Sequence, residues 1–282
     1  MALYQAWLAY DGTAFAGLQR QARARTVQGV LEQALRALGW QEAAIRYAGR
    51  TDAGVHALGQ VVAFRLTWRH GAEALLRALN AHLPADVTVW HVREAPEGFH
   101  PRYAALGRRY VYWLWCSAVR HPFQERYAWR VWPCPSADAL NRAAAQLVGR
   151  HDFAALGTPP AGARGTTVRT VYRATWYPVV EGLWAFDVAA DAFLYRMVRR
   201  MVAAQVALAQ GRIPWERWAR AFTEPPAQPW AVLAPPQGLF LAEVAYDPAT
   251  LRAWQSPTSV EAFRAWWWAR WRLQPPGRED HG

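Results

Sequence analysis

The sequence predicts an α+β protein built from two similar halves, each with a sheet covered by helices on one face. Segments with strand patterns alternate with segments of helical periodicity, and their order before residue 105 resembles the order after it. The chain has 282 residues, of which 53% are hydrophobic, so two well-packed cores are feasible. We expect an N-terminal half over residues 1–105, a C-terminal half over 106–248 and a helical tail over 249–282.

The first half opens with a strand pattern. Residues 3–10 are rich in apolar and aromatic side chains and end at the turn residues Asp11-Gly12-Thr13. Thr26 is a typical helix N-cap, because apolar residues follow it at helical spacing (Val27, Leu31, Leu35 and Leu38). The remaining expected elements of this half are a strand over 60–66, a helix over 72–83 stopped by Pro84, and a strand over 87–92.

The second half follows a comparable order of strand and helix patterns. The expected elements are a strand over 109–115, a helix over 136–148 capped by Ser136, strands over 168–177 and 183–189, a helix over 191–209 ending near Gly211, a short helix over 214–222 and a strand over 239–246. A proline-rich loop over 224–236 precedes the last strand.

The tail from Ser259 onward has a helical pattern of its own. Its aromatic residues Phe263, Trp267 and Trp271 share one helical face with Trp266 beside them, while Arg264 and Arg272 lie on another. This pattern predicts a helix packed on the body of the protein or on a partner subunit. Direct RNA contact and interfacial membrane binding are the alternatives.

The charge of the chain is strongly basic. Lys and Arg together number 32 against 21 acidic residues, a net charge of +11, and every basic residue is Arg. The absence of Lys excludes a lysine Schiff base or nucleophile. Guanidinium groups and the 18 Trp, 11 Tyr and 10 Phe suit a nucleic-acid partner, because guanidinium binds phosphate and aromatic rings stack on bases. Genomic base composition and core packing are the alternative explanation.

Several other classes of protein do not fit the sequence. Cys116 and Cys134 suggest neither a CxxC pair nor a disulfide framework, which favours a cytoplasmic setting. There is no signal-peptide pattern and no apolar run long enough to cross a bilayer. The eight His residues lack ligand spacing, and no P-loop or dinucleotide fingerprint is present, so we expect no metal and no nucleotide cofactor.

The strongest chemical signal lies in the segment 49–57, with the sequence GRTDAGVHA. Glycines on both sides of Asp52 let a large ligand approach the backbone closely. In an extended segment Arg50 and Asp52 share a face, and an Asp carboxylate, ordinarily ionised at neutral pH, is a nucleophile that needs no base. The alternative is a turn with a surface ion pair. We expect His56 to be structural, since Asp52 needs no imidazole.

Further segments accompany this motif in a fixed order. They are Tyr10-Asp11-Gly12-Thr13 with Phe15, Gly17 and Gln19; Thr26-Val27-Gln28-Gly29; Phe99-His100; Arg108-Arg109-Tyr110; His151-Asp152-Phe153; Arg169-Thr170-Val171-Tyr172-Arg173; Phe193 to Arg199; and Ala234-Pro235-Pro236 with Gly238 to Leu241. Together with the Asp52 motif, they resemble the tRNA pseudouridine synthase A family from about Ala2 to Asp247. The tail lies outside this resemblance.

The resemblance implies a reaction, a fold and a partner. The reaction breaks the bond between uracil N1 and ribose C1′ of uridines 38, 39 and 40 in the tRNA anticodon stem-loop and rejoins the base through C5. An isomerisation of this kind requires no cofactor and no metal. The implied fold has two halves whose antiparallel sheets meet along an active-site cleft, in a homodimer.

The same resemblance assigns roles to five residues of this chain. Asp52 would be the nucleophile, acting at uracil C6 or at ribose C1′. Arg199 would pair with Asp52, and Tyr110 would stack on the flipped uracil and help to take the C5 proton. Arg50 would assist extrusion of the base, which costs a few kcal/mol, and Leu239 would form an apolar floor under the uracil.

Three positions depart from the family pattern. Leu18 replaces the usual Trp, Arg196 replaces a His and Arg200 replaces an Asn. Because none of them is a predicted catalytic residue, we expect them to affect RNA contacts, substrate range or local packing. Arg196 and Arg200 are also compatible with a solvated helix face.

Two other functions are compatible with parts of the pattern. One is a non-catalytic RNA-binding protein, which would be expected to lose the nucleophile. The other is a carboxylate-dependent hydrolase, which would need a second carboxylate as general acid. Glu42 and Glu73, the acidic residues nearest in sequence, show no such pairing.

Overall fold

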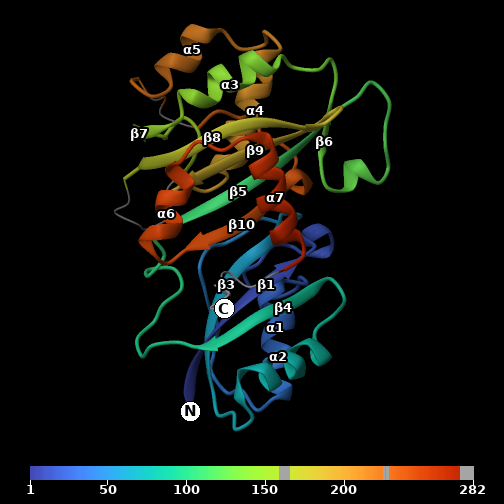
Figure 1. Cartoon of the computed structure of the whole chain (residues 1–282), viewed down its shortest axis with the longest axis vertical. Helices are drawn as coiled ribbons and strands as arrows, with labels where there is room; N and C mark the ends of the chain where they lie inside the picture. Colours follow the sequence, from blue (N-terminus) through green and yellow to red (C-terminus); the bar gives the residue numbers. More distant parts are fainter. Residues whose placement is uncertain (159–165, 225, 227–228, 274–282) are drawn as a thin grey trace. The chain divides into compact units, whose positions relative to one another are not determined.

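The chain folds into two units in a computed structural model that describes residues 1–158, 166–224, 226 and 229–273. The first unit comprises Met1–Ala105, Leu241–Val244 and the segment that begins at Arg264. The second comprises Leu106–Phe240 and Ala245–Phe263. Both contain strands and helices, so the predicted α+β class is confirmed (Figure 1).

The sheet of the first unit has β1 at its centre. The strands are β1 (Ala2–Tyr10), β3 (His56–Leu66) and β4 (Val87–Glu94), in the antiparallel order β4-β1-β3, and the short β2 (Arg46–Tyr47) pairs with β3. The helices are α1 (Val27–Ala37) and α2 (Gly71–His82), and a 3-10 turn, η1 (Gly12–Ala14), follows β1. β1 and β3 are buried along nearly their whole length, which explains their continuous apolar character.

Side-chain hydrogen bonds hold the helices of this unit in place. The Thr26 hydroxyl accepts the N–H of Gly29 at 3.2 Å, which confirms the predicted N-cap of α1. Asn80 joins α2 to β4, because its amide donates to the carbonyl of Val89 and accepts the N–H of Val89 at 2.9 Å. These bonds satisfy buried backbone groups as well as anchoring the helices.

The sheet of the second unit has the antiparallel order β5-β9-β8-β7. Its strands are β5 (Gly107–Cys116), β6 (Trp129–Val131, parallel to β5), β7 (Gly149–Asp152), β8 (Val168–Val180) and β9 (Leu183–Ala190). The helices are α3 (Ala137–Ala145), α4 (Met197–Ala209), α5 (Trp215–Arg220) and α6 (Pro248–Gln255), with the 3-10 turns η2 (Gln124–Arg126) and η3 (Pro236–Gly238). Two elements, β10 (Leu239–Ala245) and α7 (Val260–Trp271), have residues in both units.

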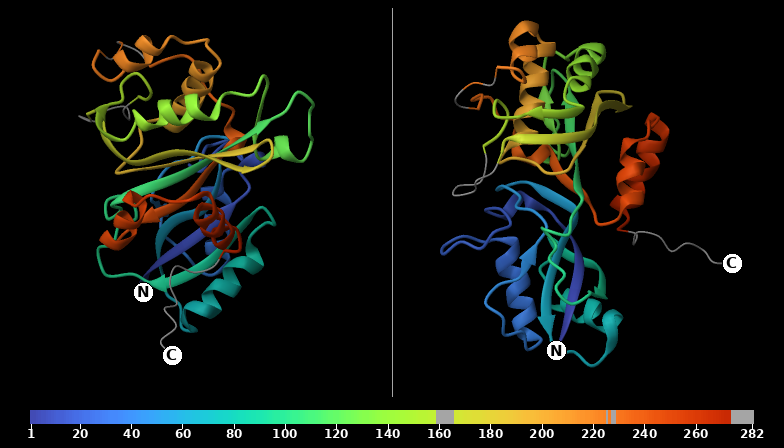
Figure 2. Two further views of the ribbon diagram at one scale, coloured as in Figure 1. Left: turned by 45° about the horizontal axis from the view of Figure 1, so that its top comes forward. Right: turned by 90° about the vertical axis from the view of Figure 1, so that its left-hand side faces the viewer.

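Alternating side chains of β8 pack on opposite faces of this sheet. Trp176 stacks on Phe186 with ring centroids 5.0 Å apart, and its indole N–H donates to Gln205 of α4 at 2.9 Å. On the other face, the ring of Tyr177 stacks on Phe263 of α7 at 4.6 Å. Trp254 of α6 packs on Ala189 of β9, so α6 and α4 lie on opposite faces of this sheet (Figure 2, right). Helices therefore cover both faces of this sheet, whereas the sequence predicted one, because α6 supplies the second layer.

The tail also confirms the prediction that its helix packs on the body of the protein. The Phe263 and Trp267 side chains are 0% and 5% exposed. Arg173 of β8 donates to the carbonyls of Trp254, at 2.8 Å, and Ser256. Its guanidinium thereby satisfies carbonyls at the C-terminal end of α6, where the helix dipole favours a cation.

Two sequence expectations are corrected. The helix expected over 191–209 begins at Met197, because β9 continues to Ala190 and Arg196 has a left-handed backbone with a φ of 60°. Cys116 and Cys134, which were not expected to pair, form a disulfide with Cα atoms 5.3 Å apart. The parallel pairing of β6 with β5 explains this proximity, because it sets Val131 beside Cys116.

Candidate active site

The loop that carries Asp52 is fixed to the strands of the first unit. The Thr51 hydroxyl is 2.7 Å from the Tyr10 hydroxyl, and the Gln60 side chain donates to the carbonyl of Gly49 at 2.8 Å. Thr51 is buried, Arg50 is exposed and Asp52 is half-buried, as expected of an extended segment whose alternate side chains face inward. The hydrogen bonds therefore anchor the loop through Thr51 and Gly49, on either side of Arg50.

Burial beneath this loop has an electrostatic consequence. Burial raises the pKa of Tyr10 to about 12, and its side-chain hydrogen bonds with Thr51 and Gln60 offset part of that effect. The Tyr10 hydroxyl thus stays protonated at neutral pH, and it supports the backbone next to Asp52.

Glycines bring neighbouring backbone against the loop. A Cβ on Gly12 would stand 2.1 Å from the carbonyl oxygen of Val55, and one on Gly17 would stand 2.8 Å from that of Thr51. Gly54 has a φ of 75°, a left-handed conformation that favours glycine. The motif needs these glycines for the packing of its own backbone, in addition to any approach by a ligand.

The other polar residues of the motif have distinct environments. His56 is 1% exposed, and its Nδ1 accepts the N–H of Gly12 at 2.9 Å, which favours the predicted structural role. The Arg50 guanidinium is exposed, and its Nε donates to the Tyr47 hydroxyl at 3.3 Å. Arg50 is therefore accessible to a ligand from solvent.

Tyr110 lies on β5 in the second unit. Its side chain is 9% exposed, and its ring meets that of Phe193 edge to face, with centroids 5.1 Å apart. The neighbouring Arg109 points to the opposite face of the sheet, where it forms a buried ion pair with Asp187. Of these two neighbours, only Tyr110 lies on the same face as Tyr112.

Arg199 lies in the first turns of α4. Its side chain is 9% exposed; its Nε donates to the carbonyl of Ala234 at 2.7 Å, while its own carbonyl accepts the N–H of Ala234 at 3.2 Å. The Tyr112 hydroxyl donates to the carbonyl of Pro235 at 2.8 Å. Burial raises the pKa of Tyr112 well above its usual range, and the nearby positive charge of Arg199 lowers it in part.

Leu239 begins β10 and is 6% exposed. The preceding Gly238 packs so closely on β5 that a Cβ there would lie 2.7 Å from the Tyr112 ring. Tyr112 thus connects the neighbourhoods of Arg199 and Leu239. The sequence analysis missed Tyr112, although its spacing of two residues from Tyr110 on a strand was a usable signal.

The residues that depart from the family pattern are not simply solvated. Arg200 donates to the carbonyls of Trp230, at 3.0 Å, and Tyr195, at 3.1 Å, so it holds the loop before η3. The Arg196 guanidinium lies over the Tyr195 ring, 4.8 Å from its centroid. Leu18 is 1% exposed, so its substitution for Trp is a change in core packing.

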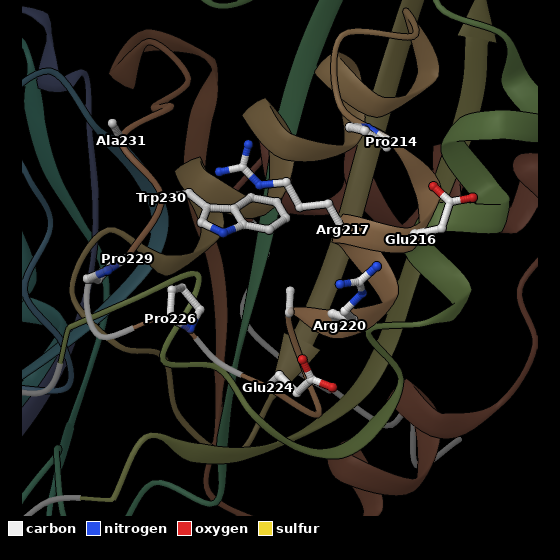
Figure 3. A pocket seen from close by; sticks show the side chains of 10 residues that line it. Pro214, Glu216, Arg217, Arg220, Glu224, Pro226, Pro229, Trp230 and Ala231 are labelled. Atoms are coloured by element: carbon white, nitrogen blue, oxygen red, sulfur yellow. The ribbon is translucent and has the colours of Figure 1, made fainter.

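A separate cavity lies beside α5 and includes none of the predicted site residues. It has a volume of about 630 Å³, and its lining includes Arg217, Arg220, Glu216, Glu224 and Trp230 (Figure 3). The Arg217 guanidinium covers the Trp230 ring at 5.2 Å. The two cationic and two anionic side chains offset one another, so this cavity does not attract phosphate strongly.

The predicted residues are thus distributed over the two units. Arg50 and Asp52 belong to the first unit, and Tyr110, Arg199 and Leu239 belong to the second. The first unit presents a carboxylate on an anchored loop, and the second presents an aromatic ring, a cation and an apolar side chain. The ring, the cation and the apolar side chain of the second unit are suited to hold a planar base, and the carboxylate of the first unit can act as a nucleophile.

The chain is similar to known proteins along most of its length. The family model described as tRNA pseudouridine synthase matches residues 6–104 and 143–247, ranges that contain Asp52, Arg199 and Leu239 but neither Tyr110 nor the tail. The chain is 40% identical over 257 residues to tRNA pseudouridine synthase A of Chloroflexus aurantiacus, covering 89% of this chain and 91% of that protein.

Other relatives are similar at the same level. The tRNA pseudouridine synthase A of Methylacidiphilum infernorum is 39% identical over 245 residues, covering 87% of this chain and 96% of that protein. Among solved structures, a chain in the crystal structure of a Cbf5-Nop10-Gar1 complex has a TM-score of 0.35 and 14% identity, over 72% of this chain and 44% of that one.

Proposed function

Because the chain belongs to the tRNA pseudouridine synthase A family, we propose that it isomerises uridines 38, 39 and 40 in the anticodon stem-loop of tRNA, with Asp52 as the nucleophile. Its enzyme class is that of the family, an isomerase that acts on uridines of tRNA. The observation that carries the finer proposal is the anchoring of the Asp52 loop. Thr51 is held by a buried hydrogen bond and Gly49 by a partly buried one, so the carboxylate is presented from a preorganised backbone.

In the proposed reaction, the bond between N1 of uracil and C1′ of ribose breaks, the base turns, and a bond forms between C5 and C1′. The C5 proton is lost, and N1 gains a proton from solvent, so atoms and electrons balance without an oxidant or a cofactor. Asp52 attacks either C6 of the base or C1′ of the ribose and is released at the end of the cycle.

Four further residues support this reaction. Tyr110, held edge to face by Phe193, stacks on the extruded uracil and helps to take its C5 proton. Arg199 supplies the positive charge that pairs with Asp52 during the reaction, and Leu239 supplies an apolar floor. The exposed Arg50 stacks in the space that the base leaves or contacts the adjacent phosphate.

The proposed setting is a cytoplasmic homodimer that binds tRNA. The net charge of +11 supports strong electrostatic attraction to RNA, so affinity should fall steeply as salt rises. None of the described helices is long and apolar enough to cross a membrane. Analytical ultracentrifugation would test the dimer, and a tRNA affinity that stayed flat between low and moderate salt would contradict the electrostatic model.

The decisive experiment uses tRNA transcripts labelled with tritium at uracil C5. Each transcript keeps uridine at one of positions 38, 39 or 40 only, and tritium released to water is counted for the wild type, Asp52→Ala and Asp52→Asn. We expect release by the wild type alone, with tRNA affinity retained in both variants. The matched control is Asp86→Asn, a partly exposed aspartate of the same unit, which should release tritium normally. Tight binding without release by the wild type would instead assign the chain a non-catalytic RNA-binding role.

A further inference from the structure

Helix α7 presents an exposed stripe of two tryptophans between two arginines. Arg264, Trp268, Trp271 and Arg272 follow the spacing i, i+4, i+7 and i+8, which is one face of an α-helix. Trp268 is 55% exposed and Trp271 is 46% exposed, while both arginines are exposed as well. We call these four residues the tail stripe. It lies outside the ranges that the family model matches.

The opposite side of α7 anchors the helix. Phe263 is 0% exposed and stacks on Tyr177, and Trp267 is 5% exposed. Trp271 contacts the buried Trp267 with ring centroids 6.3 Å apart. The helix that carries Trp268 and Trp271 is already packed on the protein. A ligand that binds them therefore loses little binding free energy to ordering this helix.

The arginines of α7 divide into two kinds. Arg270 forms an ion pair with Glu243 of β10, and that pairing fixes the helix to the first unit. Within the described part of the chain, neither Arg264 nor Arg272 forms an ion pair. Two cations thus flank two aromatic rings on one surface, which matches the combination of phosphates and bases in an unpaired stretch of nucleic acid.

Resting on the proposed function, we propose that the tail stripe binds unpaired nucleotides of the tRNA substrate at a site separate from the reacting uridine. Trp268 and Trp271 stack on bases, and Arg264 and Arg272 contact the phosphates beside them. A bilayer is a poorer match, because an interfacial helix needs a broad apolar face. The apolar face of α7, with Phe263 and Trp267, is already buried in the protein.

The test measures the equilibrium Kd of a fluorescently labelled tRNA transcript at several salt concentrations. The variants are Trp268→Ala, Trp271→Ala, Arg264→Gln and Arg272→Gln in the full chain. The matched control is Arg252→Gln, which removes the same charge from an exposed residue of α6 outside the stripe. Urea unfolding of each variant establishes that its fold is intact.

We expect each tryptophan variant to weaken tRNA binding by about fivefold or more, with an unchanged salt slope, because stacking releases no counterions. Each stripe arginine variant should lower the slope of log K against log salt by about one, because one phosphate contact is lost. Arg252→Gln should keep the wild-type affinity and slope.

Three results would overturn the proposal. The first is a tRNA Kd that is the same in Trp268→Ala, Arg264→Gln and Arg252→Gln. The second is a wild type that sediments with phosphatidylglycerol vesicles and loses this property in Trp268→Ala, which would assign the stripe to a membrane. The third is a dimer that dissociates in Trp268→Ala and Trp271→Ala, which would assign the stripe to a second copy. Because the Kd reports binding and not product formation, a wild type that releases no tritium would refute the proposed function and leave this test intact.

Discussion

Replacing Asp187 with Asn removes the carboxylate that lies between two buried guanidinium groups. Asp187 accepts two hydrogen bonds from Arg109, at 2.7 and 2.8 Å, and lies 3.5 Å from Arg173. The Asp187 side chain is 0% exposed, and those of the two arginines are 6% and 5% exposed. The substitution would remove the negative charge that faces both buried cations.

A second Arg–Asp ion pair of the chain, between Arg25 and Asp86, is also joined by two hydrogen bonds but is exposed to solvent. Arg25 donates to Asp86 at 2.7 and 2.8 Å, with side chains 39% and 28% exposed. Removing one partner of a buried pair costs about 3–5 kcal/mol, because an uncompensated charge stays buried. Breaking an exposed pair costs about 0.2–1 kcal/mol, because water replaces the lost partner. Asp187→Asn should therefore destabilise its unit several times more than Asp86→Asn destabilises the other.

Urea unfolding followed by circular dichroism measures both free energies. A double variant combines Asp187→Asn with Arg109→Met, which removes the nearer buried cation; it should cost less stability than the sum of the two single variants. Equal destabilisation by Asp187→Asn and Asp86→Asn, or strict additivity in the double variant, would refute the argument from burial.

Three further predictions follow from the same structure. Burial raises the pKa of Tyr10 to about 12 from 10.0, so its contribution to stability is complete below pH 10 and is lost as the pH rises toward 12. The free energy of unfolding should fall there by about 1.4 kcal/mol per pH unit from this group, and Tyr10→Phe should reduce that slope in urea titrations; an unchanged slope would contradict the assignment. Gly12→Ala places a Cβ 2.1 Å from a backbone oxygen of the Asp52 loop, whereas Gly49→Ala meets nothing within 4 Å. Gly12→Ala should cost about 1–3 kcal/mol and slow tritium release, and Gly49→Ala should keep the wild-type stability to within about 1 kcal/mol; equal stability losses would refute the packing argument. Phe263→Ala, at a fully buried site, should cost about 3–5 kcal/mol in urea unfolding, while Trp268→Ala, 55% exposed, should change stability by less than about 0.5 kcal/mol. A large loss for Trp268→Ala would show that its ring is needed for folding.

Local signals in the sequence predicted many of the elements. The apolar run over 3–10 and the cap at Thr26 correspond to β1 and α1, and the cap at Ser136 to α3. The pattern from Ser259 corresponds to α7, including the burial of Phe263. These signals suffice because capping and periodicity depend on residues within a few positions of one another.

Features that depend on distant segments escaped the sequence analysis. The helix expected from Asp191 begins at Met197, because Tyr195 pairs its backbone with Thr158 and Arg196 takes a left-handed conformation. The disulfide of Cys116 follows from a parallel strand pairing that no local pattern encodes.

The candidate site divides in the same way. The sequence by itself determined the chemical groups: the carboxylate of Asp52, its flanking glycines and the family to which the motif belongs. Only the tertiary structure decided that Tyr10 and Gln60 anchor the loop, and that Tyr112 links the surroundings of Arg199 to η3. Residue type and spacing specify which chemistry is available, whereas the direction and burial of a side chain depend on strand pairing and packing between segments far apart in the chain.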